Sequence, residues 1–209
     1  MDAAVHAVFG LYDKRMQEEA AYWRNPTGGK TQDDFLLAVG PATGAFLNNL
    51  VKDSGARRIL EIGTSYGYST TWLAEAAKAT GGAVTSLDVA ANKQAHAREM
   101  LEKAGLADVV EFRCGDALEL IPTLEDGLDL VLLDCWKDVY VGCLERFHPK
   151  LAPGAVVVAD NMIRPANARA DALAYRRAVR GKPDMTSVLL SLGSGLEVSR
   201  KRGPLDEGL

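Results

Sequence analysis

From Arg57 onward the chain alternates short apolar runs with longer stretches of helical character, and no other feature restricts its fold as much. Parallel strands need long crossover connections, so this alternation predicts a doubly wound α/β sheet, mostly parallel, with helices on both faces. Two late apolar runs flank a Gly-Ser-Gly turn and predict a C-terminal hairpin with antiparallel pairing. The expected strands are 58–62, 83–88, 109–114, 128–134, 155–160, 186–192 and 196–200.

The N-terminal quarter has helical periodicity instead. Apolar side chains recur at a helical spacing from Val5 to Met16, and 25–34 is a turn-rich break. A chain of 209 residues is long enough to bury one good core. We therefore expect a single domain over 1–209, with N-terminal helices and a lid over 1–56 and a core over 57–209. The expected helices are 2–24, 41–51, 68–79, 90–104, 116–124, 139–151 and 166–180.

Composition narrows the class of protein. The net charge of -4 implies no extended basic face, so general nucleic-acid affinity is not expected. Cys114, Cys135 and Cys143 are odd in number and irregular in spacing, which fits neither a zinc site nor a disulfide framework and favours a reducing compartment. The first 24 residues carry too many charges for a signal peptide, and no apolar run is long enough for a bilayer. We expect a cytoplasmic protein without membrane association.

Polar residues and glycines end the first two core strands. Glu61 and Gly63 close the first strand, and a helix opens near Ser69, so the helix N-terminus can favour a negative group. Asp88 ends the second strand, where an acid can bind both hydroxyls of a ribose. The segment is not a G-x-G-x-x-G fingerprint, which weakens a nicotinamide interpretation. Each feature alone is common, and Asp88 could simply cap a helix, but together they favour a nucleoside cofactor.

The third strand ends in a short acidic loop with two interpretations. Asp116 and Ala117 could border an adenine ring, or Asp116 could be the N-cap of the following helix. The capping role is the slightly better supported of the two.

Two further strand ends carry oxygen ligands and an amine. Asp134 and Lys137 follow one apolar run, and Asp160 and Asn161 follow the next. Ligands bind outside the carboxyl ends of parallel strands, and oxygen donors suit a hard divalent cation. Taken singly, Asp160-Asn161 could be an Asx turn, Lys137 a solvated surface lysine and Trp136 a core residue. Their joint placement at two adjacent strand ends favours a metal site with a base beside it.

These motifs resemble those of a known family. The segments EIGTSYGYS (61–69), DCWKDVY (134–140) and ADNMIRP (159–165) look like the metal-dependent catechol O-methyltransferases, within the cation-dependent family that includes the caffeoyl-CoA enzymes. The resemblance covers roughly residues 35–200. It implies a Rossmann-like, seven-stranded class I sheet and a reaction that uses S-adenosylmethionine and Mg²⁺ (or another divalent cation).

The resemblance also implies a role for each matching residue. Lys137 would be the general base. The metal would be held by Asp134, Asp160 and Asn161, and the catechol-type acceptor would lie against Phe35, Trp136, Lys137, Asn161 and Pro165. The cofactor would be bound by Val39, Glu61, Gly63, Ser69, Asp88, Asp116, Ala117, Asp134 and Trp136.

Several departures from the mammalian-type enzyme leave the acceptor open. Cys135 replaces a histidine beside the adenine, Asp88 replaces a glutamate, and 186–192 lacks the glutamate that steadies the second catechol hydroxyl; Glu197 is the nearest acid. The arginine-rich stretch 164–182 is most simply a solvated helix face, but it could dock a CoA thioester or a tRNA. The alternatives are therefore a tRNA-modifying O-methyltransferase and a non-catalytic S-adenosylmethionine-binding protein. A homodimer through the amphipathic N-terminal helix is a further prediction.

Overall fold

The computed structural model describes residues 1–26 and 28–203, and a seven-stranded sheet forms its centre. The strand order is β3-β2-β1-β4-β5-β7-β6, with parallel pairing from β3 to β5 and antiparallel pairing of β7 with both β5 and β6. The predicted sheet and its C-terminal hairpin are confirmed. The strands are β1 (Arg58–Ile62), β2 (Ala83–Asp88), β3 (Val110–Cys114), β4 (Leu128–Leu133), β5 (Leu151–Ala159), β6 (Met185–Leu190) and β7 (Leu196–Lys201).

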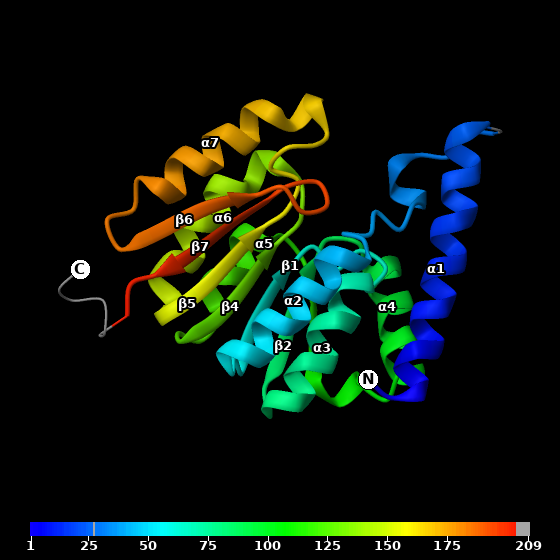
Figure 1. Cartoon of the computed structure of the whole chain (residues 1–209), viewed down its shortest axis with the longest axis horizontal. Coiled ribbons are helices and arrows are strands. Elements are labelled where there is room, and N and C mark those ends of the chain that lie inside the picture. The colour runs from blue at the N-terminus through cyan, green and yellow to red at the C-terminus, as the bar shows by residue number, and fades with distance from the viewer. Residues whose placement is uncertain (27, 204–209) are drawn as a thin grey trace.

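Helices cover both faces of the sheet. The helices are α1 (Ala3–Arg24), α2 (Pro41–Ser54), α3 (Tyr68–Thr80), α4 (Ala91–Lys103), α5 (Ala117–Leu120), α6 (Tyr140–Phe147) and α7 (Arg169–Arg180). Helices α1 to α4 contribute to one hydrophobic cluster, and α6 and α7 contribute to the other. Figure 1 shows α1 and α7 on opposite sides of the molecule.

The two clusters follow from the alternation of side chains along each strand. Leu130 and Leu132 of β4 belong to the first cluster, whereas Val131 and Leu133 belong to the second. Successive side chains of a strand point to opposite faces, so a strand buried on both faces is a continuous apolar run. All four residues are essentially inaccessible to solvent, and for this reason the apolar run in the sequence correctly predicted a buried strand.

Some predicted boundaries were wrong. Strand β5 begins at Leu151 rather than at 155, because Pro153 and Gly154 are accommodated by a register shift opposite Leu128 and Leu130 instead of ending the strand. The predicted helix 139–151 ends at Phe147 and continues as a 3-10 turn, His148–Lys150. The predicted helix 116–124 is a single α-helical turn, after which Ile121–Thr123 is 3-10, since Pro122 has no amide hydrogen to donate.

Helix α1 has the predicted amphipathic pattern. Val5, Val8, Phe9 and Tyr12 are buried at the spacing of one helical face. They pack in the same cluster as α3 and α4, and the Tyr12 hydroxyl donates a hydrogen bond to the Tyr66 carbonyl at 2.8 Å. Within the described residues, no helix combines the length and apolarity that crossing a bilayer requires.

Candidate active site

Three neighbouring strand ends bring the predicted motifs together. The Asp134 amide donates to the Ile62 carbonyl at 2.9 Å, and the Asp160 amide donates to the Leu133 carbonyl at 3.1 Å. The carboxyl ends of β1, β4 and β5 therefore lie side by side. Strands β2 and β3 follow β1 on one side of the sheet, and β4 and β5 lie on its other side, so the strand order reverses between β1 and β4. Such a reversal is the switch point at which open α/β sheets bind ligands.

The loop after β1 depends on Gly63. Its φ is +107°, and a Cβ built there would lie 2.0 Å from the Asp134 carbonyl oxygen. Only glycine combines that backbone conformation with so close an approach of two chain segments. Gly63 thus sets the distance between the loop after β1 and the loop after β4.

Glu61 lies beneath this loop and is completely buried. Its carboxylate accepts hydrogen bonds from the hydroxyls of Ser69 and Thr70, each at 2.6 Å, and of Ser86 at 2.5 Å. Burial raises the pKa of Glu61 to about 7, although the three hydroxyl donors oppose that shift. In this structure Glu61 and Ser69 bind each other and fasten β1 to the start of α3. Their contact with a cofactor stays a prediction.

Asp88 lies at the end of β2, facing the same loop. One carboxylate oxygen accepts from the Ser65 amide at 2.7 Å, and the other accepts from the Ala90 amide at 2.8 Å. Each carboxylate oxygen has two acceptor sites, so capacity for ribose hydroxyls is left. The two backbone donors orient the carboxylate for that use.

Asp116 caps α5, as the simpler of its two interpretations predicted. Its Oδ1 accepts from the Leu118 amide at 2.8 Å, and Ala117 is the first residue of that helix. The capping bond occupies one oxygen only, and a further contact with an adenine ring stays a prediction.

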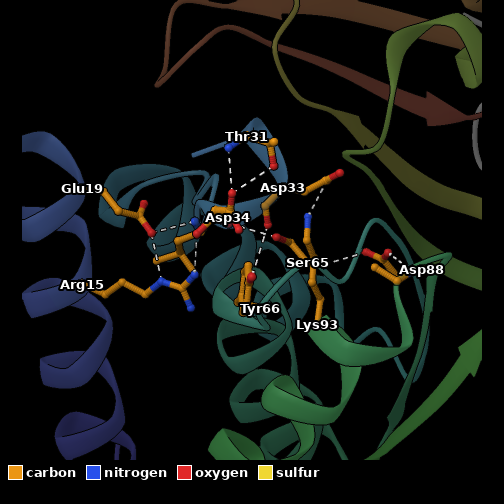
Figure 2. A network of polar contacts seen from close by, with 11 residues as sticks. Arg15, Glu19, Thr31, Asp33, Asp34, Ser65, Tyr66, Asp88 and Lys93 are labelled. Atoms are coloured by element: carbon orange, nitrogen blue, oxygen red, sulfur yellow. Dashed lines mark hydrogen bonds and ion pairs between the residues drawn. The ribbon is translucent and has the colours of Figure 1, made fainter. Parts of the chain in front are cut away.

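A polar network fastens α1 and the segment after it to the loop between β1 and α3 (Figure 2). The Glu19 carboxylate accepts from Arg15 Nε at 2.9 Å and from the Leu36 amide at 2.8 Å. The Arg15 guanidinium stacks over the Tyr66 ring at 3.7 Å, and the Ser65 hydroxyl donates to the Leu36 carbonyl at 3.0 Å. The segment that contains Val39 is thereby held against the predicted cofactor loop.

The second half of the site contains two carboxylates in a buried setting. Asp160 is only 2% exposed, and burial followed by the charge of Asp134 raises its pKa to about 7. Burial also raises the pKa of Asp134, while Lys137 opposes that shift from an Nζ–Oδ1 distance of 3.5 Å. The Asp134 side chain is 15% exposed. A divalent cation would stabilise these two carboxylates, because it would offset their mutual repulsion.

Asn161 is the third predicted ligand of the metal. Asn161 has a φ of +60°, which is uncommon for a residue with a side chain. Its backbone N–H donates a hydrogen bond to Asp160 Oδ1 at 2.6 Å. Among the described residues no group of three His, Cys, Asp or Glu side chains could hold a metal ion. A cation here would depend on two carboxylates, the Asn161 amide oxygen and water, which fits the all-oxygen shell of Mg²⁺.

Some of the residues that are predicted to contact the acceptor ring are exposed in the structure, and one is buried. Trp136 is 54% exposed and Pro165 is exposed, whereas Phe35 is 1% exposed. Phe35 is covered by Trp23 and Tyr22 of α1, with ring centroids 4.5 and 5.3 Å away. In this conformation Phe35 packs against the end of α1, and its direct contact with an acceptor stays a prediction.

Sequence reasoning missed Leu37 and Ile163, two exposed apolar residues in the segments that border the site. Each is 44% exposed, and Leu37 has a φ of +51°. Ile163 is held by the β6–β7 turn, because the Ser194 carbonyl accepts hydrogen bonds from the amides of Ile163 and Arg164 at 2.9 and 3.0 Å. Ile163 lies inside the ADNMIRP motif (159–165), two residues after Asn161. Its place in that motif could have indicated that it borders the site.

The arginine-rich stretch is not one uniform solvated face. Arg176 and Arg180 form ion pairs with Glu197, which is completely buried on β7, at 3.0 and 2.6 Å. Lys182 pairs with Glu145 at 2.6 Å. Three of the predicted basic residues therefore hold α7 and its C-terminal end against the rest of the molecule. Three others are exposed: Arg164, Arg169 and Arg177.

Comparisons with known proteins agree with this geometry. A family model described as O-methyltransferase matches residues 23–202. A catechol O-methyltransferase of Mycobacterium tuberculosis is 41% identical over 150 residues, which cover 69% of this chain and 68% of that enzyme. A catechol O-methyltransferase of Niastella koreensis is 36% identical over 61% of this chain and 59% of that enzyme, so the match spans less than two thirds of its length.

A solved structure extends the similarity to the fold. The O-methyltransferase TomG from Streptomyces achromogenes, in complex with SAM, superposes with a TM-score of 0.75 at 27% identity, covering 88% of this chain and 95% of that one. Together with the family model and the strand-end motifs, these likenesses identify the class of the protein. The chain belongs to the O-methyltransferase family, among its class I, S-adenosylmethionine-dependent, catechol O-methyltransferase-like members.

Proposed function

We propose that the protein transfers a methyl group from S-adenosylmethionine to one hydroxyl of a catechol-type small molecule, in a reaction that needs a divalent cation and uses Lys137 as general base. The observation that carries this proposal is the juxtaposition of an amine with two carboxylates that repel each other, one buried and one largely buried. Asp134 and Asp160 lie on adjacent strand ends, and the Lys137 amine is 3.5 Å from Asp134 Oδ1.

Asp134, Asp160 and Asn161 would hold the cation, which would chelate a vicinal diol and lower the pKa of its hydroxyls. The buried surroundings of Asp160 would strengthen its electrostatic interaction with the cation. Lys137 would accept the proton of the attacking hydroxyl. Alignment of the acceptor oxygen with the methyl group is the main catalytic requirement, and exposed Trp136 would provide one wall for the acceptor ring.

The cofactor would lie over the loop between β1 and α3. Asp88, oriented by two backbone donors, would bind the ribose hydroxyls, and the Val39 backbone would contribute from the segment held in the polar network. The N-terminus of α3 would favour the carboxylate of the methionine moiety. Gly63 would allow the cofactor and the loop after β4 to approach closely.

The proposal is tested by methyl transfer from labelled S-adenosylmethionine to a panel of catechols, with and without Mg²⁺. The variants are Asp160→Asn and Lys137→Met, and calorimetry measures cofactor binding in each. We expect turnover that requires the cation and Asp160, and a fall in kcat of about 10²- to 10⁴-fold without the base. Cation-independent turnover, or full activity of Lys137→Met, would overturn the corresponding part of the proposal.

The same experiment also tests the alternative that the protein is a tRNA-modifying methyltransferase. Its support in the structure is limited to Arg164, Arg169 and Arg177, because the other arginines of that region are bound to Glu197. If no catechol is methylated while the cofactor binds, a larger or anionic acceptor becomes the better explanation. Salt-sensitive binding of tRNA, lost on substitution of the three exposed arginines, would then support it.

A further inference from the structure

Tyr140 is a buried residue next to the proposed base that the sequence analysis did not assign. It begins α6, three residues after Lys137, and it is 0% exposed. Its position follows from the helix itself, because the other buried residues of α6 are Cys143, Leu144 and Phe147, which lie on the same helical face. The packing of that face against the sheet delivers the Tyr140 hydroxyl to the ends of β4 and β5.

The Tyr140 hydroxyl is held by the sheet. It donates to the Leu133 carbonyl at 2.8 Å, and the Asp160 carbonyl lies 3.4 Å away. These carbonyls belong to the last residue of β4 and the first residue after β5. The hydroxyl is therefore tied to the backbone next to two proposed metal ligands.

The same hydroxyl accepts a hydrogen bond from Lys137. The distance from Lys137 Nζ to the Tyr140 oxygen is 2.5 Å, and Nζ also donates to the Cys135 carbonyl at 2.9 Å. In addition, the amine lies 4.4 Å from the centroid of the Tyr140 ring. Tyr140 thus contacts the amine through both its hydroxyl and its ring, while the Asp134 carboxylate is farther, at 3.5 Å.

We propose that Tyr140 is a positioning residue that fixes the Lys137 amine beside the carboxylates; this inference rests on the proposed function of Lys137. A lysine side chain has four rotatable bonds, so an unanchored amine loses most of the benefit of proximity. Without the hydroxyl, the amine would keep only the Cys135 carbonyl and its ion pair with Asp134. It would then be free to sample more positions and would be aligned with the acceptor hydroxyl for less of the time.

A double-mutant cycle tests this role, with Tyr140→Phe, Lys137→Met and the combination of both. We expect Tyr140→Phe to lower kcat about 10- to 100-fold, because it removes a hydrogen bond that aligns the amine of the base. The KM for the acceptor and the Kd for the cofactor should stay within about twofold of the wild-type values, since the Tyr140 side chain is completely buried. In the Lys137→Met background the same substitution should cause no further loss of kcat.

Tyr175→Phe is a matched control. Tyr175 is equally buried, packs edge-on against Tyr140 with ring centroids 5.5 Å apart, and its hydroxyl has no hydrogen-bond partner within the part of the chain that the structure describes. Loss of this hydroxyl perturbs the same aromatic pair without touching the amine, so kcat should stay within about twofold. Rates are expressed per cofactor-binding site, so unfolded protein does not imitate a loss of activity.

The results distinguish a failure of the proposed base, Lys137, from a failure of the proposed role of Tyr140. Full activity of Lys137→Met would overturn the proposed base and, with it, the role of Tyr140. A large loss in Lys137→Met would support the base. If Tyr140→Phe then matches Tyr175→Phe, or lowers kcat by the same factor with and without Lys137, the positioning role alone is overturned.

Discussion

Replacement of Gly63 by alanine is the most severe single change that the structure of the site predicts. The new methyl group would meet the carbonyl oxygen of Asp134 at 2.0 Å and its carbonyl carbon at 2.6 Å, both of them backbone atoms. Neither atom can move without displacing the end of β4. Relief of the clash therefore requires the loops after β1 and β4 to separate.

The expected loss of unfolding free energy in Gly63→Ala has two parts. A left-handed backbone conformation costs an L-residue about 1–2 kcal/mol, and the φ of Gly63 is +107°. Insertion of a methyl group into a packed site typically costs about 1–3 kcal/mol more. The sum, about 2–5 kcal/mol, is a large part of the about 5–15 kcal/mol by which a folded domain is stable.

Denaturant unfolding monitored by circular dichroism measures this loss, and Gly81→Ala isolates its cause. Gly81 also has a positive φ, +68°, but a Cβ there would meet nothing within 4 Å. Gly81→Ala should therefore lose only the conformational part, about 1–2 kcal/mol. Equal losses for the two variants, with unchanged m-values, would refute the clash as the reason that position 63 requires glycine.

Two further predictions concern buried carboxylates. The pKa of Glu61 is raised from 4.5 to about 7 in the folded protein, so its contribution to stability is complete below pH 4.5 and is lost as the pH rises through 7. Wild-type protein should lose up to about 3 kcal/mol of unfolding free energy between pH 4.5 and 8 that Glu61→Gln does not lose; parallel pH profiles in chemical denaturation would contradict this. For Glu197, removal of both partners by Arg176→Met and Arg180→Met should destabilise the protein by about 3–5 kcal/mol, because the fully buried carboxylate is left unpaired. Glu197→Gln should cost less, since the arginines are 22% and 44% exposed and can rehydrate; the reverse order in thermal unfolding would disprove the argument.

The sheet and the strand-end pairs were predictable because their signals are local. Residues 130–133 of β4 form a continuous apolar run, and a run of that kind must be buried on both faces. A polar residue directly after such a run lies at the rim by connectivity alone. The sequence was therefore sufficient to place Asp134 and Asp160 together.

The features that escaped prediction depend on tertiary contacts. Phe35 is covered by Tyr22 and Trp23 of α1, and nothing in the local sequence indicates that these rings pack together. The burial of Glu197 is compensated by arginines that looked like solvated surface residues. Tyr140 was part of a quoted motif, but only the fold shows that its hydroxyl reaches Lys137.

The turn between β6 and β7 also has a consequence for how the segments around it can change in evolution. The Ser194 carbonyl of the turn accepts hydrogen bonds from the amides of Ile163 and Arg164, and a Cβ built at Gly193 would lie 2.5 Å from Thr43 Oγ1. In Figure 1 the turn lies outside the layers of the sheet, beyond the strand ends. Gly195 of the same turn leaves no room for a side chain, because a Cβ built there would lie 2.4 Å from Ile163 Cγ1. A substitution at either glycine would therefore displace a segment far away in the sequence, so the turn and its two neighbours are expected to evolve as one unit.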